Sequence, residues 1–171
     1  NFGDAESGYY NASTYLGKKE TIAFGVSYTA QTDAAIETAT SNSVDYSLLS
    51  IDAFIEQPLG KGSFTAEAAY SKVDLDGAGD LTTGGNGTKS EGDGFYVQSG
   101  YLVNDWQVWA GYEQWTSNNN EDYGSFDSAR IGVTYFLKGQ NLNVKAGFEK
   151  TNLDWDNSSD TAFVLGAYVN F

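Results

Sequence analysis

The chain has 171 residues, with 23 Asp and Glu against nine Lys and Arg, a net charge of −14. So few basic residues argue against a nucleic-acid partner, because binding a phosphate backbone requires clustered Lys and Arg. The absence of His and Cys excludes Ser-His-Asp triads, cysteine nucleophiles, disulfides and zinc sites built on these ligands. We therefore expect no enzyme, no cofactor and no metal site.

Apolar and polar residues alternate along most of the chain, with the period of two that is typical of β-strands. Residues 22–29, for example, alternate between a row of Ile, Phe, Val and Tyr and a row of Ala, Gly, Ser and Thr. The pattern predicts nine strands, at residues 9–16, 22–29, 49–56, 64–71, 95–103, 106–113, 128–137, 141–149 and 161–171, of which the first is the weakest. Strands of about ten residues have the length that crosses a bilayer at a tilt.

The predicted connections alternate between short and long. The short ones are Gly17–Lys19, Leu59–Gly62, Asn104–Asp105 and Lys138–Gln140, whose Gly and Asn supply the positive φ of tight hairpins. The long polar ones are Gln31–Val44, Leu75–Asp93, Thr116–Phe126 and Asn152–Ser159. Short turns at one end and long loops at the other are typical of outer-membrane barrels, whose short turns are periplasmic.

Alternation is equally compatible with a soluble β-sandwich binding module, in which the apolar row points inward. Three features favour an all-β, antiparallel transmembrane barrel with a polar lumen. Aromatic residues of the apolar row lie near strand ends, as in girdles at the two membrane interfaces: Tyr28, Tyr70, Tyr101, Trp106 and Tyr135. The polar row is densely charged, and the side chains that we expect to line the lumen are Asp52, Glu56, Glu67, Glu113, Arg130, Lys145 and Glu149. The chain also ends on Phe171, at the tip of an apolar row.

Two interpretations stay open for the polar row. Its charges either set the ion selectivity of a channel or form salt bridges along the wall, with Arg130 or Lys145 bound to Glu113 or Glu149 on neighbouring strands. The aromatic members of the row, Tyr96, Trp109 and Trp115, either stack on sugars or fill space beside Gly25, Gly100, Gly111 and Gly132. The second interpretation of the aromatic residues is favoured.

Most of the acidic residues lie in the predicted long loops, whereas Lys18, Lys19, Lys61 and Lys138 lie at the short turns. Acidic loops beside anionic lipopolysaccharide would repel it, so divalent cations are expected to bridge the loops to the lipid. Asp74–Asp80 has the acid-and-glycine composition of a calcium loop but lacks the register of an EF-hand, which favours a solvated loop.

Five segments, in order, resemble the phosphate-selective porin O and P family: Thr14–Lys19, Thr65–Tyr70, Gly94–Tyr101, Ala110–Trp115 and Gly132–Asn141. The resemblance covers nearly the whole chain but only the C-terminal half of that family's barrel. It implies a 16-stranded, homotrimeric porin whose terminal Phe is an assembly signal. The family's anion selectivity comes from ladders of Arg and Lys, whereas the predicted lumen has only two cations, so phosphate specificity is not carried over.

These observations predict one domain over residues 1–171, a diffusion porin for small hydrophilic solutes or ions in an outer membrane of the Gram-negative type. The alternatives are a structural or adhesive outer-membrane barrel and the soluble β-sandwich. Because bacterial barrels have even strand numbers, nine strands predict the C-terminal part of a longer barrel. Alternatively, residues 9–16 leave the wall as a plug or arm, which would give a closed eight-stranded barrel.

Overall fold

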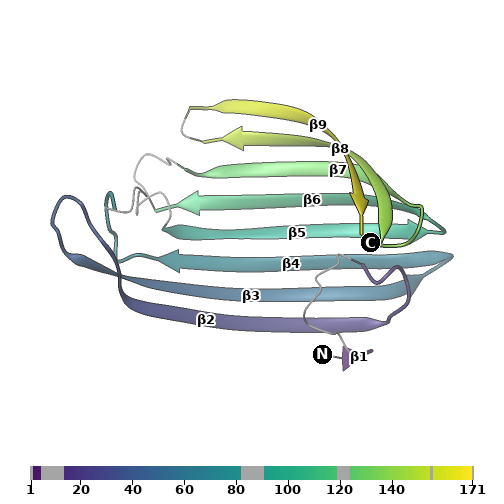
Figure 1. The fold of residues 1–171 in the computed structure, drawn as a ribbon, viewed down its shortest axis with the longest axis horizontal. Coiled ribbons are helices and arrows are strands. Elements are labelled where there is room, and N and C mark those ends of the chain that lie inside the picture. Colours follow the sequence, from purple (N-terminus) through teal and green to yellow (C-terminus); the bar gives the residue numbers. More distant parts are fainter. Residues whose placement is uncertain (1, 5–13, 82–90, 119–123, 155, 171) are drawn as a thin grey trace.

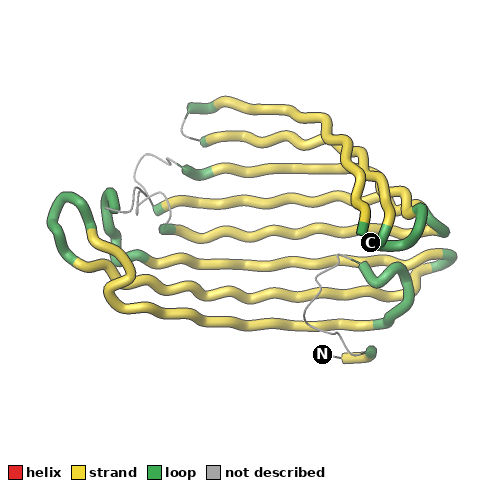
Figure 2. Tube along the Cα trace, viewed as in Figure 1, coloured by secondary structure: helices red, strands yellow, loops and turns green. Residues whose placement is uncertain are grey.

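The computed structural model describes residues 2–4, 14–81, 91–118, 124–154 and 156–170. They form one nine-stranded antiparallel sheet and include no helix (Figures 1 and 2). The strands are β1 (Phe2–Gly3), β2 (Thr21–Ile36), β3 (Ser43–Leu59), β4 (Gly62–Asp74), β5 (Gly92–Val103), β6 (Trp106–Ser117), β7 (Phe126–Phe136), β8 (Leu142–Leu153) and β9 (Ser158–Val169). The prediction of an all-β antiparallel fold is confirmed.

The order of strands in the sheet follows the order in the chain, so each strand pairs with the next. The sheet is open: among the described residues β9 pairs only with β8, and the outer edge of β2 carries only the two-residue β1. Closure into a barrel is therefore not part of the described structure. The described residues contain no helix that is long and apolar enough to span a membrane.

Two of the boundaries expected in the N-terminal part of the chain are wrong. Of the strand expected at 9–16, residues 9–13 lie outside the described part of the chain, and residues 14–16 form a turn region instead. The long connection expected at 31–44 is mostly strand, since β2 and β3 extend to Ile36 and Ser43. A register shift between Gln31 and Ala35 interrupts the period of two there, and Asp33 takes a φ of 51°. Sequence alternation does not reveal a strand across such a bulge.

The short turns lie where the sequence predicts them. Gly60, Asn104 and Gly139 have φ of 61°, 54° and 57°, the left-handed conformation that tight hairpins require. At the opposite end of the sheet, long connections join β4 to β5 and β6 to β7, whereas β8 and β9 are separated by only four residues, so the long connection expected at 152–159 is wrong. We call the two ends of the sheet the short-turn end and the long-loop end.

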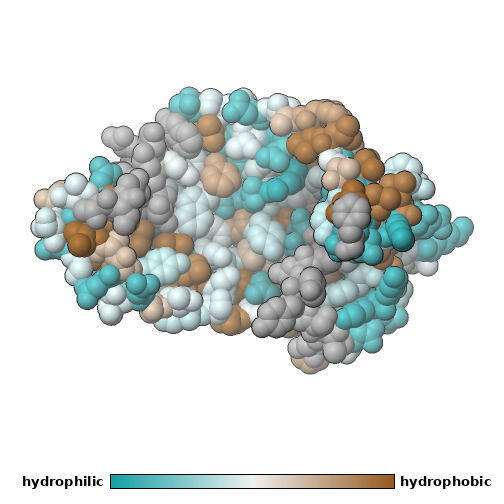
Figure 3. All heavy atoms as spheres, viewed as in Figure 1, coloured by the Kyte–Doolittle hydropathy of each residue, from teal (hydrophilic) through white to brown (hydrophobic). Residues whose placement is uncertain are grey.

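Pairing sorts the side chains onto two faces, because residues directly opposite in neighbouring strands point the same way. One row runs across six strands from β3 to β8: Phe54, Glu67, Gln98, Gly111, Arg130 and Glu149. We call this polar side the inner face. In Figure 3, which is viewed from this side, pale and teal residues predominate over the middle strands.

The opposite, outer face is apolar and exposed. Its exposed large side chains include Phe24, Val26, Tyr28, Ile51, Tyr70, Phe95, Val97, Tyr101, Trp106, Val108, Ile131, Val144, Phe148, Phe163 and Leu165. Buried residues are mostly polar, with twelve polar or charged against five apolar among those described. The usual arrangement of a water-soluble domain, with an apolar interior and a polar surface, is thus reversed.

Candidate functional site

The register brings all seven charged residues that the sequence assigns to a lumen onto the inner face. Asp52 pairs with Ala69 and Glu67 with Gln98, so β3 and β4 contribute acids. Arg130 lies between Gly111 and Glu149, and Lys145 lies opposite Thr134. The acidic residues are thus spread from β3 to β8, whereas both cations lie on the adjacent strands β7 and β8.

One ion pair joins two of these charges across neighbouring strands. The guanidinium of Arg130 on β7 contacts the carboxylate of Glu113 on β6, and both side chains are 34% exposed. This is one of the wall salt bridges that the sequence leaves open. Lys145 forms no ion pair with any residue that the structure describes. Of the two cations on the inner face, Arg130 is therefore in an ion pair and Lys145 is not.

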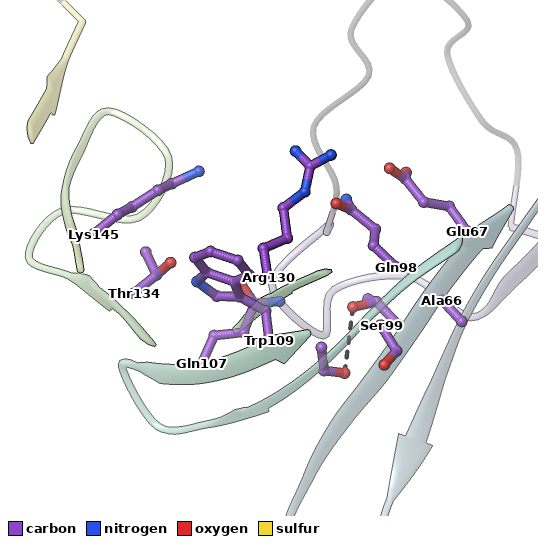
Figure 4. A pocket seen from close by; sticks show the side chains of 11 residues that line it. Ala66, Glu67, Gln98, Ser99, Gln107, Trp109, Arg130, Thr134 and Lys145 are labelled. Atoms are coloured by element: carbon purple, nitrogen blue, oxygen red, sulfur yellow. Dashed lines mark hydrogen bonds between the residues drawn. The ribbon is translucent and has the colours of Figure 1, made fainter. Parts of the chain in front are cut away.

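A cavity of about 210 Å³ opens on the inner face, lined by residues of β4 to β8. Figure 4 shows Lys145 and Thr134 at one side, Trp109 and Arg130 in the middle, and Gln98 and Glu67 at the other side. Since its lining comes from five successive strands, the inner face is concave. Its lining combines cations, an acid, amides, a hydroxyl and an indole, which are the groups that contact hydrophilic solutes.

Trp109 lies flat across two glycines on the neighbouring strands. It is paired with Gly132 on β7, which is paired with Gly147 on β8. A Cβ atom at Gly132 would collide with Cζ2 of the indole, and one at Gly147 would lie 3.0 Å from Cη2. The expectation that an aromatic residue fills space beside Gly132 is confirmed for Trp109. Sequence analysis did not identify the second glycine of the pair.

Glu56 is the exception among the seven charged residues. It is on the inner row but 0% exposed, covered by residues 14–17, which we call the strap. Its carboxylate accepts hydrogen bonds from Oγ1 of Thr14 (2.9 Å) and from the backbone N–H groups of Tyr15 (2.8 Å) and Gly17 (2.8 Å). The prediction that Glu56 lines open space is therefore wrong, because its charge binds the strap rather than water.

The strap reaches from β3 to the turn between β7 and β8. The ring of Tyr15 packs edge-on against Phe54 at 5.8 Å between centroids. The amide Nε2 of Gln140 donates to the carbonyl oxygen of Thr14 at 2.9 Å. Figure 1 shows this part of the chain in front of the sheet, near the short turns. The strap thus covers part of the concave face at the short-turn end.

At the long-loop end another glutamate binds a loop. Glu91 accepts hydrogen bonds from the backbone N–H groups of Leu75 (3.1 Å) and Gly77 (2.8 Å) and from the amide of Asn118 (2.7 Å). Burial raises the pKa of Glu91, but these hydrogen bonds and the nearby Lys72 outweigh it and leave the pKa below its usual value. Glu91 is therefore held in its charged form.

Residues 75–79, which we call the loop segment, have two further supports. Leu75 and Ala78 pack against Val44, on the same alternate row of β3 as Glu56. Glu37 accepts a hydrogen bond from the backbone N–H of Gly79 at 2.8 Å and another from the hydroxyl of Thr40. The Thr40 and Gly79 bonds lower the pKa of Glu37. No group of three or more acidic side chains in the described part of the chain is arranged to hold a metal ion.

Of the aromatic residues that the sequence assigns to two girdles, Tyr101, Trp106 and Tyr135 lie on the outer face near the short turns, whereas Tyr70 lies toward the long-loop end of β4 and Tyr28 in the middle of β2. Trp106 and Tyr135 are directly paired, with ring centroids 4.6 Å apart. The hydroxyl of Tyr101 donates to the carbonyl oxygen of Leu59 at 2.8 Å. These contacts place amphipathic rings at one level of the sheet. Phe171 lies outside the described residues.

No protein-family model matches the chain, and neither does any curated protein or solved structure. These comparisons identify no family. The features that point to a function are the two faces of the sheet and the inner-face cavity.

Proposed function

We propose that this chain forms part of the wall of an outer-membrane porin, a water-filled channel for passive diffusion of small hydrophilic solutes or ions. The observation that carries the proposal is the reversed polarity of the sheet, with an apolar outer face and a charged, concave inner face. In a membrane barrel the outer row contacts lipid and the inner row contacts water. The resemblance of five segments to the porin O and P family supports the same function.

Strand length is consistent with a membrane span. From β2 to β9 the strands have 11 to 17 residues, and about 9 to 11 tilted residues cross the hydrocarbon core. In hydrocarbon each unpaired backbone group of a sheet edge costs several kcal/mol. The proposed pore therefore requires the backbone groups at both edges, β2 and β9, to be paired. Homotrimer formation and contact of the acidic loops with lipopolysaccharide through divalent cations belong to the same proposal.

A soluble β-sandwich is the less favoured alternative. It would require a second layer over the outer face, and the described residues include no such layer. Instead, Phe24, Val26 and Leu165 are 66%, 74% and 69% exposed. Covering this face with lipid removes the same apolar surface from water without a second layer.

Extraction and electrophoresis test the proposal. The natural full-length protein should leave membranes only with detergent and should change mobility when boiled before gel electrophoresis, because closed barrels resist detergent. Added to planar bilayers, it should produce discrete conductance steps. A protein that stays in aqueous solution without detergent and shows no heat-dependent shift would exclude the pore.

The inner-face charges predict weak selectivity for cations. With Glu56 covered, four acids (Asp52, Glu67, Glu113 and Glu149) face two cations (Arg130 and Lys145), a balance of −2 from −4 and +2. Salt should weaken the preference further by screening. Reversal potentials under a salt gradient measure it, and Glu67→Gln should shift them toward anions. Strong anion preference of the unmodified pore would contradict this assignment.

A further inference from the structure

We propose that the inner face carries a sugar-binding subsite, in which a pyranose ring stacks on the indole of Trp109. The inference depends on the proposed pore and names a class of solute that it would bind. It starts from the cavity of about 210 Å³ between β4 and β8, which Trp109 lines.

The glycine pair makes the indole a flat shelf rather than a projecting side chain. Gly132 and Gly147 leave no side-chain volume beneath the ring, so the indole lies against the backbone of β7 and β8. One ring face is then covered by the sheet, and the other is turned toward the concavity. A sugar ring has an apolar C–H face that fits such a shelf, as other apolar groups pack on aromatic faces.

Polar groups surround the shelf on several sides. Gln98 is partly exposed in the cavity and has an amide that both donates and accepts hydrogen bonds, whereas Gln107 and Thr134 form its floor and are 7% and 1% exposed. Arg130 and Lys145 add donors, and Figure 4 shows Trp109 between Arg130 and Thr134. The indole Nε1–H is buried and has no hydrogen-bond partner among the described residues, so the ring offers its exposed face rather than this donor. A site of this composition can donate to and accept from the several hydroxyls around a pyranose ring.

The charges favour a neutral solute over a simple ion. Arg130 is already compensated by Glu113, and the cavity contains both Glu67 and Lys145. A small anion would contact only Arg130 and Lys145 and would make no contact with the indole. A neutral sugar can use the ring face together with the amide of Gln98 and the charged groups at the cavity rim, which is the pattern of a small-molecule site with an apolar surface and a few placed polar groups.

Channel recordings test the subsite in the natural full-length protein. Methyl α-D-glucopyranoside added to open channels should reduce the current in a saturable way. Sorbitol, which has hydroxyls but no ring, should block only at much higher concentration. Trp109→Leu should raise the half-blocking concentration of the glucoside about tenfold, whereas Trp109→Phe should raise it less.

A further variant separates stacking from general damage to the wall. Trp115→Leu is the matched control, since Trp115 is on the same strand and face but outside the cavity, and its block should be unchanged. The subsite would be overturned if sorbitol blocked the channel as well as the glucoside, if the glucoside did not block it, or if Trp109→Leu left the block unchanged. None of these results would contradict the proposed pore. Absence of any channel would overturn the proposed function.

Discussion

Glu56 and Glu91 hold chain segments at opposite ends of the sheet, and they do so with similar chemistry. Each carboxylate accepts three hydrogen bonds, two of them from backbone N–H groups. Glu56 is 0% exposed and Glu91 is 8% exposed. A buried carboxylate with several donors replaces the hydrogen bonds that the segment would otherwise form with water.

The two ends differ in what else holds the segment. The loop segment has an apolar cluster beneath it, formed by Leu75, Ala78 and Val44, and a further hydrogen bond to Glu37. The strap is held by one aromatic contact, between Tyr15 and Phe54, and by polar contacts to a distant turn. The strap should therefore depend more on its glutamate than the loop segment does.

Removing the charge of Glu56 is the most severe test of this difference. Glu56→Gln should lower the free energy of unfolding by about 3 kcal/mol, because a buried charged acceptor is lost and backbone donors are left unpaired. Urea unfolding in detergent measures the change. The matched control is Glu149→Gln, on the same face but without a hydrogen bond or ion pair in the described part of the chain, which should change stability by less than about 0.5 kcal/mol.

Backbone geometry gives the next largest effect at the same end. Gly17 has a φ of 70°, and an added Cβ would lie 3.2 Å from Cβ of Ser63. Gly17→Ala should therefore cost about 1.5 kcal/mol through the left-handed conformation alone. Gly77→Ala at the other end has a φ of 67° but open space around it, and is the comparison variant. A smaller loss at Gly17 than at Gly77 would contradict the tight fit of the strap.

At the long-loop end, Glu91→Gln should cost about 1 kcal/mol, less than Glu56→Gln, because the apolar cluster still holds the loop segment. Hydrogen exchange at the N–H groups of Leu75 and Gly77 should quicken, whereas exchange in the strap should not change. Equal losses for the two glutamate variants would show that the apolar cluster contributes nothing.

Acid should reproduce part of the effect of Glu91→Gln at the long-loop end. The pKa of Glu91 is lowered in the folded state, so its contribution is present above the ordinary carboxyl pKa and is lost as pH falls through the lower folded value. Below about pH 4, near the ordinary glutamate pKa, limited proteolysis should begin to cut the loop segment more readily. The same profile measured on Glu91→Gln should be flatter.

Much of the sheet is predictable because period two survives along β4 to β9. The alternation of side chains along each strand, which we call parity, is enough to assign Glu67, Arg130 and Lys145 to one face. The register confirms that they share this face. The pairing of Arg130 with Glu113 was one of several open alternatives, since parity does not distinguish between charges that are close on a face. The sequence did not predict the bulge between Gln31 and Ala35, because the bulge interrupts the period of two on which the strand prediction depends.

The strap and the indole shelf could not be derived from parity. Glu56 accepts hydrogen bonds from backbone N–H groups 39 and 41 residues away in the sequence. Every residue type except proline has such a donor, so the pattern of side chains does not predict these contacts. The turn prediction does not supply the missing contact either. Counting outward from a turn centred on Gly139 would place Gly132 opposite Ala146, one residue from the Gly147 that the observed register gives it. A turn placed only to within one residue therefore does not fix which side chains lie opposite each other.

The order of contacts along the chain has a consequence for how the protein is assembled. Every strand pairs with its sequence neighbour, so the sheet can grow by successive hairpins whose loop-closure entropy is small. The hydrogen bond from Gln140 to Thr14 spans 126 residues and needs the turn after β7 to have formed. It is thus a late contact, and Gln140→Ala should leave the rate of early hairpin formation unchanged while slowing only the final docking of the strap.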